Sequence, residues 1–183
     1  DAVVHVVITL TARDDQAVLA ITGSTSVVYG QTLKLTAAGG SGSGAVTYRI
    51  DKAASTGEAV IDPRTGVLTP VRVGSVSIIA AKAGDGDYNA VISAPCVIMI
   101  IPATPTGAPR YTPITTSGKT LKDAGLTLTG STLKPDAGRL EWVDDKGNAL
   151  SDDTVVEANR TYKWRFTPDD GNYASLTGEV RLY

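Results

Sequence analysis

The sequence predicts an all-β chain that contains two β-sandwich modules in tandem. Apolar residues alternate with polar residues over short stretches, as in half-buried strands, and no stretch sustains a helical period. Thr, Val, Ala, Gly and Ser dominate, which is a composition typical of short strands and tight turns. The turn at Asp85–Tyr88 recurs at Asp170–Tyr173, 85 positions later, and each copy lies between two apolar runs. A chain of 183 residues is long enough for two such modules.

The first module is expected to follow a separate opening strand at residues 2–11, one face of which carries Val4, Val6, Ile8 and Leu10. We interpret residues 1–14 as the terminal strand of a preceding repeat, and the alternative is an extra edge strand of the first module. The module itself covers residues 15–102 and contains about seven short strands between turns. These predicted strands span 17–22, 27–35, 46–50, 59–61, 67–69, 75–82 and 91–101. Residues 39–44, GGSGSG, are expected to form a flexible connection within it.

The second module is predicted to follow a short Pro-rich linker at residues 102–109, PATPTGAP, which holds three prolines and one glycine. The module covers residues 103–183. Its predicted strands span 112–116, 126–129, 139–143, 154–157, 161–167 and 176–183. Residues 120–124 are the one candidate for a helical turn.

The strand at 161–167 carries the heaviest apolar load of the chain. Its three aromatic residues alternate with two cations and therefore share one face of the strand. On the strand at 139–143, Trp142 shares a face with Leu140. This pattern favours a core of aromatic side chains over an exposed platform on which sugars stack. The predicted core residues are Trp142, Tyr162, Trp164, Phe166, Tyr88 and Tyr173.

The end of the strand at 91–101 is apolar on both faces. One face carries Cys96, Ile98 and Ile100, and the other carries Val97, Met99 and Ile101. An ordinary sandwich strand leaves one face in solvent, so the second apolar face predicts a covering partner. The candidates are the Pro-rich linker, the neighbouring module and the opening strand.

The charge distribution argues against nucleic acid as a partner. The formal net charge is −2, with 7 basic and 8 acidic residues up to Pro102 and 10 and 11 from Ala103 onward. Neither half has the basic excess that nucleic-acid binding requires. No segment reaches the roughly 18 apolar residues of a transmembrane helix, so no membrane insertion is expected. Cys96 is the only cysteine, which excludes an intramolecular disulfide.

The candidate metal ligands are Asp85, Asp87 and Asn89, whose alternate spacing matches the start of a calcium loop. The positions that an EF-hand loop fills with Gly and Glu are Ala90 and Cys96, so a turn with acidic side chains that cap backbone amides is favoured. No cofactor and no catalytic residues are predicted. The only histidine is His5, and a catalytic or zinc site would have to recruit it from the opening strand.

Four motifs follow one another between Val27 and Ala90: YGQTLKL, GGSGSGAVTY, IDPRTGVL and KAGDGDYNA. In this order they resemble the bacterial immunoglobulin-like repeats of large, Gram-positive-type cell-surface proteins. The second half resembles a companion repeat through SGKTLKDAGLTLTG, GRLEWVDDKGNAL and YKWRFTPDDGNYASLTGEV. The resemblance implies two tandem immunoglobulin-like sandwiches and an extracellular location at the bacterial cell surface.

The same resemblance implies a non-catalytic role as a spacer or adhesin stalk, with neighbouring repeats of the same chain as partners. The alternative is a module that binds an extracellular glycan or a host protein through the loops at one end of a sandwich. A third possibility is an accessory region of a secreted hydrolase whose catalytic domain lies elsewhere. Repeats of this kind serve in all three settings, so the resemblance alone does not choose among them.

Overall fold

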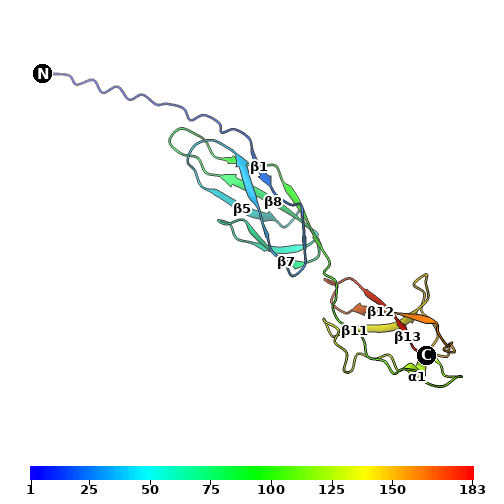
Figure 1. Cartoon of the computed structure of the whole chain (residues 1–183). Helices are drawn as coiled ribbons and strands as arrows, with labels where there is room; N and C mark the ends of the chain where they lie inside the picture. Colours follow the sequence, from blue (N-terminus) through cyan, green and yellow to red (C-terminus); the bar gives the residue numbers. More distant parts are fainter. The chain divides into compact units, whose positions relative to one another are not determined.

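The computed structural model describes all 183 residues, and the chain divides into two compact units, Asp1–Ile101 and Pro102–Tyr183 (Figure 1). The fold is all-β, because every regular element except a single helical turn is a strand. Each unit has its own cluster of buried apolar side chains. The two units are therefore described one at a time.

The first unit contains ten strands in two layers. They are β1 (Leu19–Thr22), β2 (Ser26–Val28), β3 (Leu33–Lys34), β4 (Thr36–Gly39), β5 (Val46–Asp51), β6 (Glu58–Ile61), β7 (Val67–Arg72), β8 (Gly74–Lys82), β9 (Val91–Ile92) and β10 (Cys96–Ile101). One layer has the order β2-β10-β8-β5, and β9 pairs with β8. The other layer consists of β3-β7-β6 and β1-β4, and these two small sheets are continuous through the chain because only Leu35 separates β3 from β4.

The core of the first unit lies between these two layers. Alternate residues of the central strand β8, namely Val76, Ile78 and Ala80, are fully buried. They belong to one cluster with side chains from both layers, including Leu19 of β1 and Leu68 of β7. Because successive side chains of a strand point to opposite faces, alternating apolar residues place one apolar face on each sheet, and the two apolar faces pack together.

Residues 1–13 contain no strand. Their large apolar side chains, such as Val3 and Leu10, are 76–91% exposed. The interpretation of this segment as an extra edge strand is therefore wrong, since its N–H and C=O groups pair with no strand of the first unit. Its interpretation as the terminal strand of a preceding repeat stays a prediction. The first pairing of the chain is the bridge between Asp14 and Tyr88.

Two long predicted strands of the first unit are interrupted. The segment 27–35 turns at Gly30, whose φ of +87° suits glycine, and becomes β2 and β3. The segment 91–101 breaks after Ile92, where Ser93 exchanges hydrogen bonds with Ala80: its N–H donates to the Ala80 carbonyl at 2.8 Å and its Oγ accepts the Ala80 N–H at 2.9 Å. These hydrogen bonds replace the regular ladder for one step.

The second unit contains one antiparallel sheet in the order β11-β12-β13, formed by β11 (Gly138–Val143), β12 (Thr161–Pro168) and β13 (Leu176–Arg181). A helical turn, α1 (Leu121–Ala124), begins after a capping box at Thr120 and ends at Gly125 in the left-handed conformation. The candidate helical turn of the sequence is thus confirmed.

The predicted strands at 112–116, 126–129 and 154–157 are wrong. These segments form single hydrogen bonds or isolated bridges instead, such as Arg110 with Thr127 and Thr120 with Val155. Pro113 lacks an N–H, and glycines with positive φ bracket 126–129, so none of these stretches continues a ladder. Irregular chain and α1 therefore cover the sheet where the sequence predicted a second sheet.

Four of the six predicted core aromatics are buried in the second unit: Trp142, Tyr162, Trp164 and Phe166. They pack with side chains of the covering segments, such as Leu121 of α1. The core prediction is wrong for the tyrosines of the two repeated turns. Tyr88 and Tyr173 are only half-buried and lie outside both clusters, because each follows a turn at the edge of its unit.

The linker prediction for residues 102–109 is wrong from Ala103 onward. Ala103 donates its N–H to the Asn172 carbonyl at 3.0 Å and accepts the Ala174 N–H at 2.8 Å. Thr106 and Lys134 exchange two further hydrogen bonds, at 3.0 and 2.9 Å. Two prolines of the segment, Pro105 and Pro109, are buried. The segment is thus a packed part of the second unit.

The substitution Gly178→Ala tests the packing of β13 against β12. A Cβ at Gly178 would overlap the indole ring of Trp164, which is itself buried, so we expect the second unit to lose about 1–3 kcal/mol of stability. Urea unfolding of the full chain followed by tryptophan fluorescence reports this unit alone, since both tryptophans lie in it. Gly171→Ala is the matched control, because a Cβ there meets open space. Equal stability of the two variants would contradict this packing.

Candidate functional site

The entry point of the chain into the first unit is fixed by Gln16. Its side-chain amide donates to the carbonyls of Ala83 at 3.0 Å and Asn89 at 2.8 Å. Its Oε1 accepts the N–H of Ser41 at 2.9 Å. One side chain thus joins the start of the unit to the loop after β4 and to the chain after β8. No pattern in the sequence indicates this role, because Gln16 lies in a polar stretch that predicts only a break between strands.

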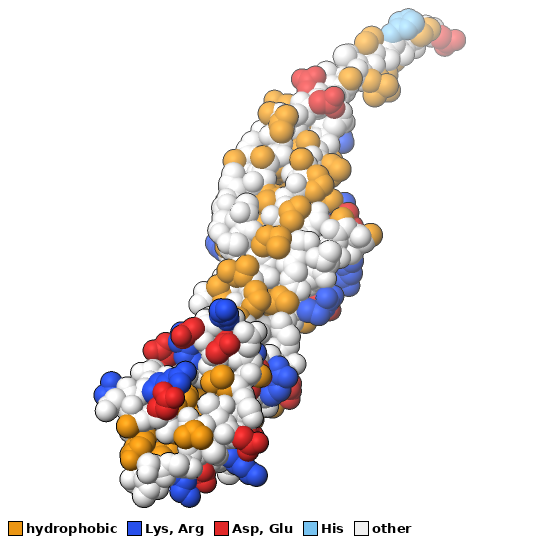
Figure 2. Space-filling view, turned by 90° about the vertical axis from the view of Figure 1, so that its right-hand side faces the viewer, with side chains coloured by type: hydrophobic (Ala, Val, Ile, Leu, Met, Phe, Trp, Pro, Cys, Tyr) orange, Lys and Arg blue, Asp and Glu red, His pale blue; other side chains and the backbone are white.

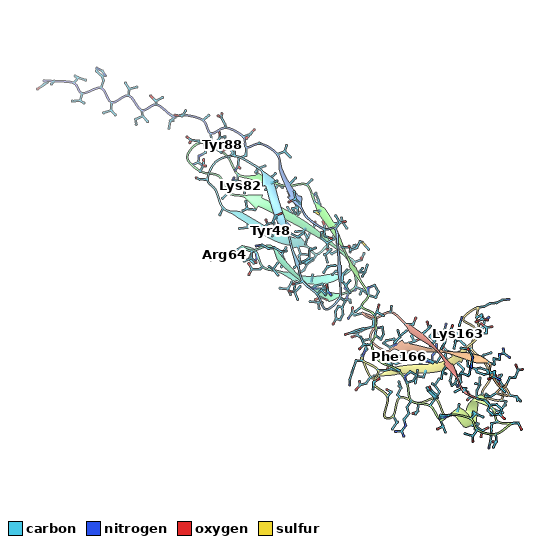
Figure 3. The ribbon with its side chains drawn as sticks, viewed as in Figure 1. Tyr48, Arg64, Lys82, Tyr88, Lys163 and Phe166 are labelled. Atoms are coloured by element: carbon cyan, nitrogen blue, oxygen red, sulfur yellow. The ribbon has the colours of Figure 1, made fainter.

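Asp85 holds the turn that follows β8. Its Oδ1 accepts the backbone N–H groups of Asp87 at 2.8 Å and Tyr88 at 2.9 Å, and its Oδ2 accepts the N–H of Ser43 at 2.7 Å. Tyr88 lies at the same end of the unit as Lys82 (Figure 3). The hydrogen bonds that Asp85 accepts from the N–H groups of Ser43, Asp87 and Tyr88 lower its pKa to about 2, since each stabilises the charged carboxylate. The carboxylate therefore caps backbone amides.

The expected flexible connection at 39–44 is in fact a constrained loop. Gly39, Gly40 and Gly42 adopt positive φ, and a Cβ on Gly42 would overlap the Asp85 carboxylate. The glycines allow the loop to approach Gln16 and Asp85 closely. The prediction of flexibility is wrong because the composition indicates freedom in the unfolded chain but not the hydrogen bonds available in the fold.

The three calcium candidates do not converge on one point. Asp85 is directed to backbone amides, and the Asn89 amide donates to the Asp15 carboxylate at 3.1 Å and to the Arg13 carbonyl at 3.3 Å. No group of three or more acidic, histidine or cysteine side chains in the chain is arranged to hold a metal ion. The structure thus assigns Asp85 and Asn89 to hydrogen bonds that close this end of the unit.

The acid stability of the first unit tests this role of Asp85. The pKa of Asp85 is depressed in the folded chain, so its contribution is present above pH 4 and is lost as the pH falls toward 2. We expect Asp85→Ala to lower the melting temperature at pH 7 and to flatten the pH dependence between pH 4 and pH 2. Asp87→Ala is the control, since Asp87 takes part in this turn through its backbone. Equal melting curves for the two variants at pH 7 would argue against the capping role. Calorimetry of the full chain measures both.

The strands β2 and β10, the second and the last of the unit, run parallel and side by side. Their register pairs Ser26 with Met99 and Val28 with Ile101. Two flanking hydrogen bonds extend the ladder: Met99 donates to the Thr25 carbonyl at 2.8 Å, and Tyr29 donates to the Ile101 carbonyl at 2.9 Å. The second strand of the unit is thus bonded to its last strand, while β1 pairs with β4.

The second unit has a smaller version of the same arrangement. Ile114, near its start, donates its N–H to the carbonyl of Leu182, near its end, at 2.7 Å. Both side chains are buried in the same cluster. The bond between Ala103 and Asn172 ties the start of this unit to its repeated turn as well.

Charged residues cover the outer face of the sheet in the second unit. Arg165 donates to the Glu141 carboxylate through Nη2 at 2.7 Å and Nε at 3.1 Å. These hydrogen bonds hold the pKa of Glu141 below its usual value. Lys163 forms ion pairs with Asp145 at 2.9 Å and Glu179 at 3.4 Å, which raise its pKa. The two cations that alternate with the core aromatics thus cross-link the three strands.

A cleft of about 350 Å³ lies between β11 and α1. Its apolar walls come from four leucines, Leu121, Leu126, Leu140 and Leu150. Lys122 and Asp152 stand at its rim. The cleft also borders Trp142, but that indole ring is only 3% exposed and offers no stacking surface. A volume of this size suits a small ligand or a short peptide segment.

Comparison with known proteins gives likeness to solved structures only. No protein-family model matches the chain, and no curated protein matches it. The chain is similar to the crystal structure of Drosophila N-cadherin EC1-4, with 11% sequence identity and a TM-score of 0.37. The match covers 93% of this chain and 51% of that one, so this chain spans about half the length of that structure.

The helical turn α1 is four residues long, and no helix of the chain could span a membrane.

Proposed function

We propose that this chain is a non-catalytic, load-bearing spacer in the stalk of a bacterial cell-surface protein. The observation that carries the proposal is the parallel pairing of β2 with β10. A stalk is pulled at the two ends of each unit. In a parallel pair joined in this way, such a pull slides one strand along the other, so all the hydrogen bonds of the ladder resist the load together.

The topology of the first unit supports the immunoglobulin-like part of this proposal. In one layer β1 pairs with β4, and β3, which adjoins β4 in the chain, begins the sheet β3-β7-β6. The other layer contains the order β5-β8-β10. In chain order these correspond to the strand sets ABED and CFG of an immunoglobulin sandwich, with β2 added beside the last strand. The bacterial and extracellular parts of the proposal rest on the four ordered motifs between Val27 and Ala90.

The entry contacts support a spacer in a further respect. Gln16 and Asn89 fix the chain at the point where it enters the first unit. At the other end, Ala103 is bonded within the second unit only two residues after β10 ends at Ile101. Only Pro102 separates β10 from the first hydrogen-bonded residue of the second unit, and short connections preserve the reach of a stalk.

Single-molecule pulling of the full chain by its two termini tests the spacer function. We expect two separate unfolding steps, each releasing roughly 250–300 Å of chain. Tyr29→Pro and Tyr29→Ala both remove the ring that packs on the core, but only the proline also removes the N–H that donates to Ile101. The first unit of Tyr29→Pro should therefore unfold about fivefold faster than that of Tyr29→Ala at constant force, the effect of about 1 kcal/mol.

Val28→Pro is the matched control for this experiment, because in a parallel ladder the N–H one residue earlier points away from β10. Smooth extension without distinct steps would contradict a load-bearing role. So would equal unfolding rates for the two proline variants.

A second candidate function is the binding of a glycan or a host protein, and the cleft beside α1 favours it. A multivalent display of the full chain, screened against glycans and extracellular-matrix proteins, detects even a weak site. We expect any ligand of the cleft to be lost on Lys122→Glu at its rim and kept on Lys146→Glu in the exposed β11–β12 turn. Binding that is insensitive to Lys122→Glu would exclude the cleft.

A further inference from the structure

The outer face of the sheet β2-β10-β8-β5 carries a row of exposed apolar side chains, which we call the apolar stripe. Its members are Ile92, Val97, Met99 and Ile101, with exposed fractions of 65, 51, 47 and 43%. Three of them alternate along β10 with the buried Ile98 and Ile100. Hydrophobic side chains gather in this way over one face of the first unit in Figure 2. Contiguous apolar surface of this kind marks a site of association.

The neighbouring strand β8 continues this face without any charge. The residues of β8 on this side are Ser75, Ser77, Ile79 and Ala81. Val97 is directly beside Ser77, and Met99 is beside Ser75. Ser77 and Ile79 are 3% and 8% exposed, so the accessible apolar surface of this face comes from β9 and β10. A strand such as β10, apolar on both faces, has the pattern of one covered on both sides.

The opening segment of the same chain does not provide this cover. Residues 2–11 were one of the candidate partners, but Val4, Ile8 and Leu10 are themselves 77–91% exposed. They make no strand pairing with the first unit. The stripe therefore needs a partner other than this segment.

The margin of the face carries one cation and one anion. Arg49 and Asp51 lie on β5, on the same side as the stripe, beside Ile79 and Ser77 respectively. Neither side chain forms an ion pair within the chain, whose eight salt bridges involve other residues. A surface with one unpaired charge of each sign, two positions apart, is complementary to itself under a two-fold rotation.

We propose that this face binds the same face of a second copy of the chain. In such an isologous contact the two apolar stripes cover each other, and Arg49 of each copy lies opposite Asp51 of the other. The apolar contact supplies the stability, and the two reciprocal ion pairs set the register. This inference goes beyond the spacer function and does not depend on it, because it concerns lateral pairing of chains.

Analytical ultracentrifugation of the full chain, from micromolar to near-millimolar concentration, tests the apolar part of the contact. We expect a reversible monomer–dimer equilibrium. Met99→Glu places a charge at the centre of the stripe and should leave the chain monomeric over the whole range. Val60→Glu is the matched control, since Val60 is 63% exposed on β6 of the other layer and should leave dimerisation unchanged.

A charge swap tests the two-fold register. Arg49→Asp alone, or Asp51→Arg alone, puts two like-charged pairs into the contact and should weaken dimerisation by about tenfold or more. The double variant Arg49→Asp with Asp51→Arg restores both pairs and should restore the native dimerisation constant. Circular dichroism confirms that each variant keeps its fold.

Three outcomes would overturn the proposal. A chain that is monomeric at every concentration has no self-association to explain. Dimerisation that Met99→Glu leaves intact would lie on another surface. A double charge variant that remains as weak as the single variants would exclude the register of Arg49 opposite Asp51, and with it the isologous contact.

Discussion

Both units depend on one constraint at their central strand. This strand must pair with a neighbour on each of its edges and must also bury every second side chain. In the first unit this strand is β8, which pairs with β10, β5 and β9 and buries Val76, Ile78 and Ala80. In the second unit it is β12, which lies between β11 and β13 and buries Tyr162, Trp164 and Phe166. The same sheet can then be covered differently, by a second layer of strands in one unit and by irregular chain with α1 in the other. What the cover must supply is apolar surface, and regular strands are only one way to provide it.

The ends of each unit are fixed by hydrogen bonds to its own closing elements. In the first unit Gln16 and Asp85 satisfy backbone groups of two loops, and β2 pairs with β10. These contacts join positions far apart in sequence, so each closes a long loop whose ordering the core must offset. Under the proposed spacer function, a pull on the unit is carried by the ladder of hydrogen bonds between β2 and β10. The mechanical proposal therefore follows from which strands are neighbours and not from any one side chain.

Structure could be predicted from the sequence where it depends on a local pattern of residues. The prediction was wrong where the structure depends on a neighbouring strand or on a hydrogen-bond partner far away in the sequence. The alternation of Tyr162, Trp164 and Phe166 with two cations placed β12 and its buried face correctly. Residues 2–11 have an equally good strand pattern and form no strand, because a strand also needs a paired neighbour and this segment has none. The glycines of 39–44 predicted freedom, yet Gln16 and Asp85 hold that loop from 25 and 42 positions away. Long-range hydrogen bonds of this kind leave no periodic trace in the sequence.

The same distinction explains why the candidate sites changed. Asp85, Asp87 and Asn89 have the spacing of metal ligands, but spacing does not determine which way a carboxylate points, and backbone amides of the turn occupy Asp85. The apolar outer face of β10 was predictable, since both sets of alternate residues are apolar. Its exposure was not, because that depends on the rest of the fold. This face has the apolar pattern of a covered surface but is exposed in the single chain. It also lies beside Arg49 and Asp51, which form no ion pair within the chain. These two properties are the reason for proposing it as an interface.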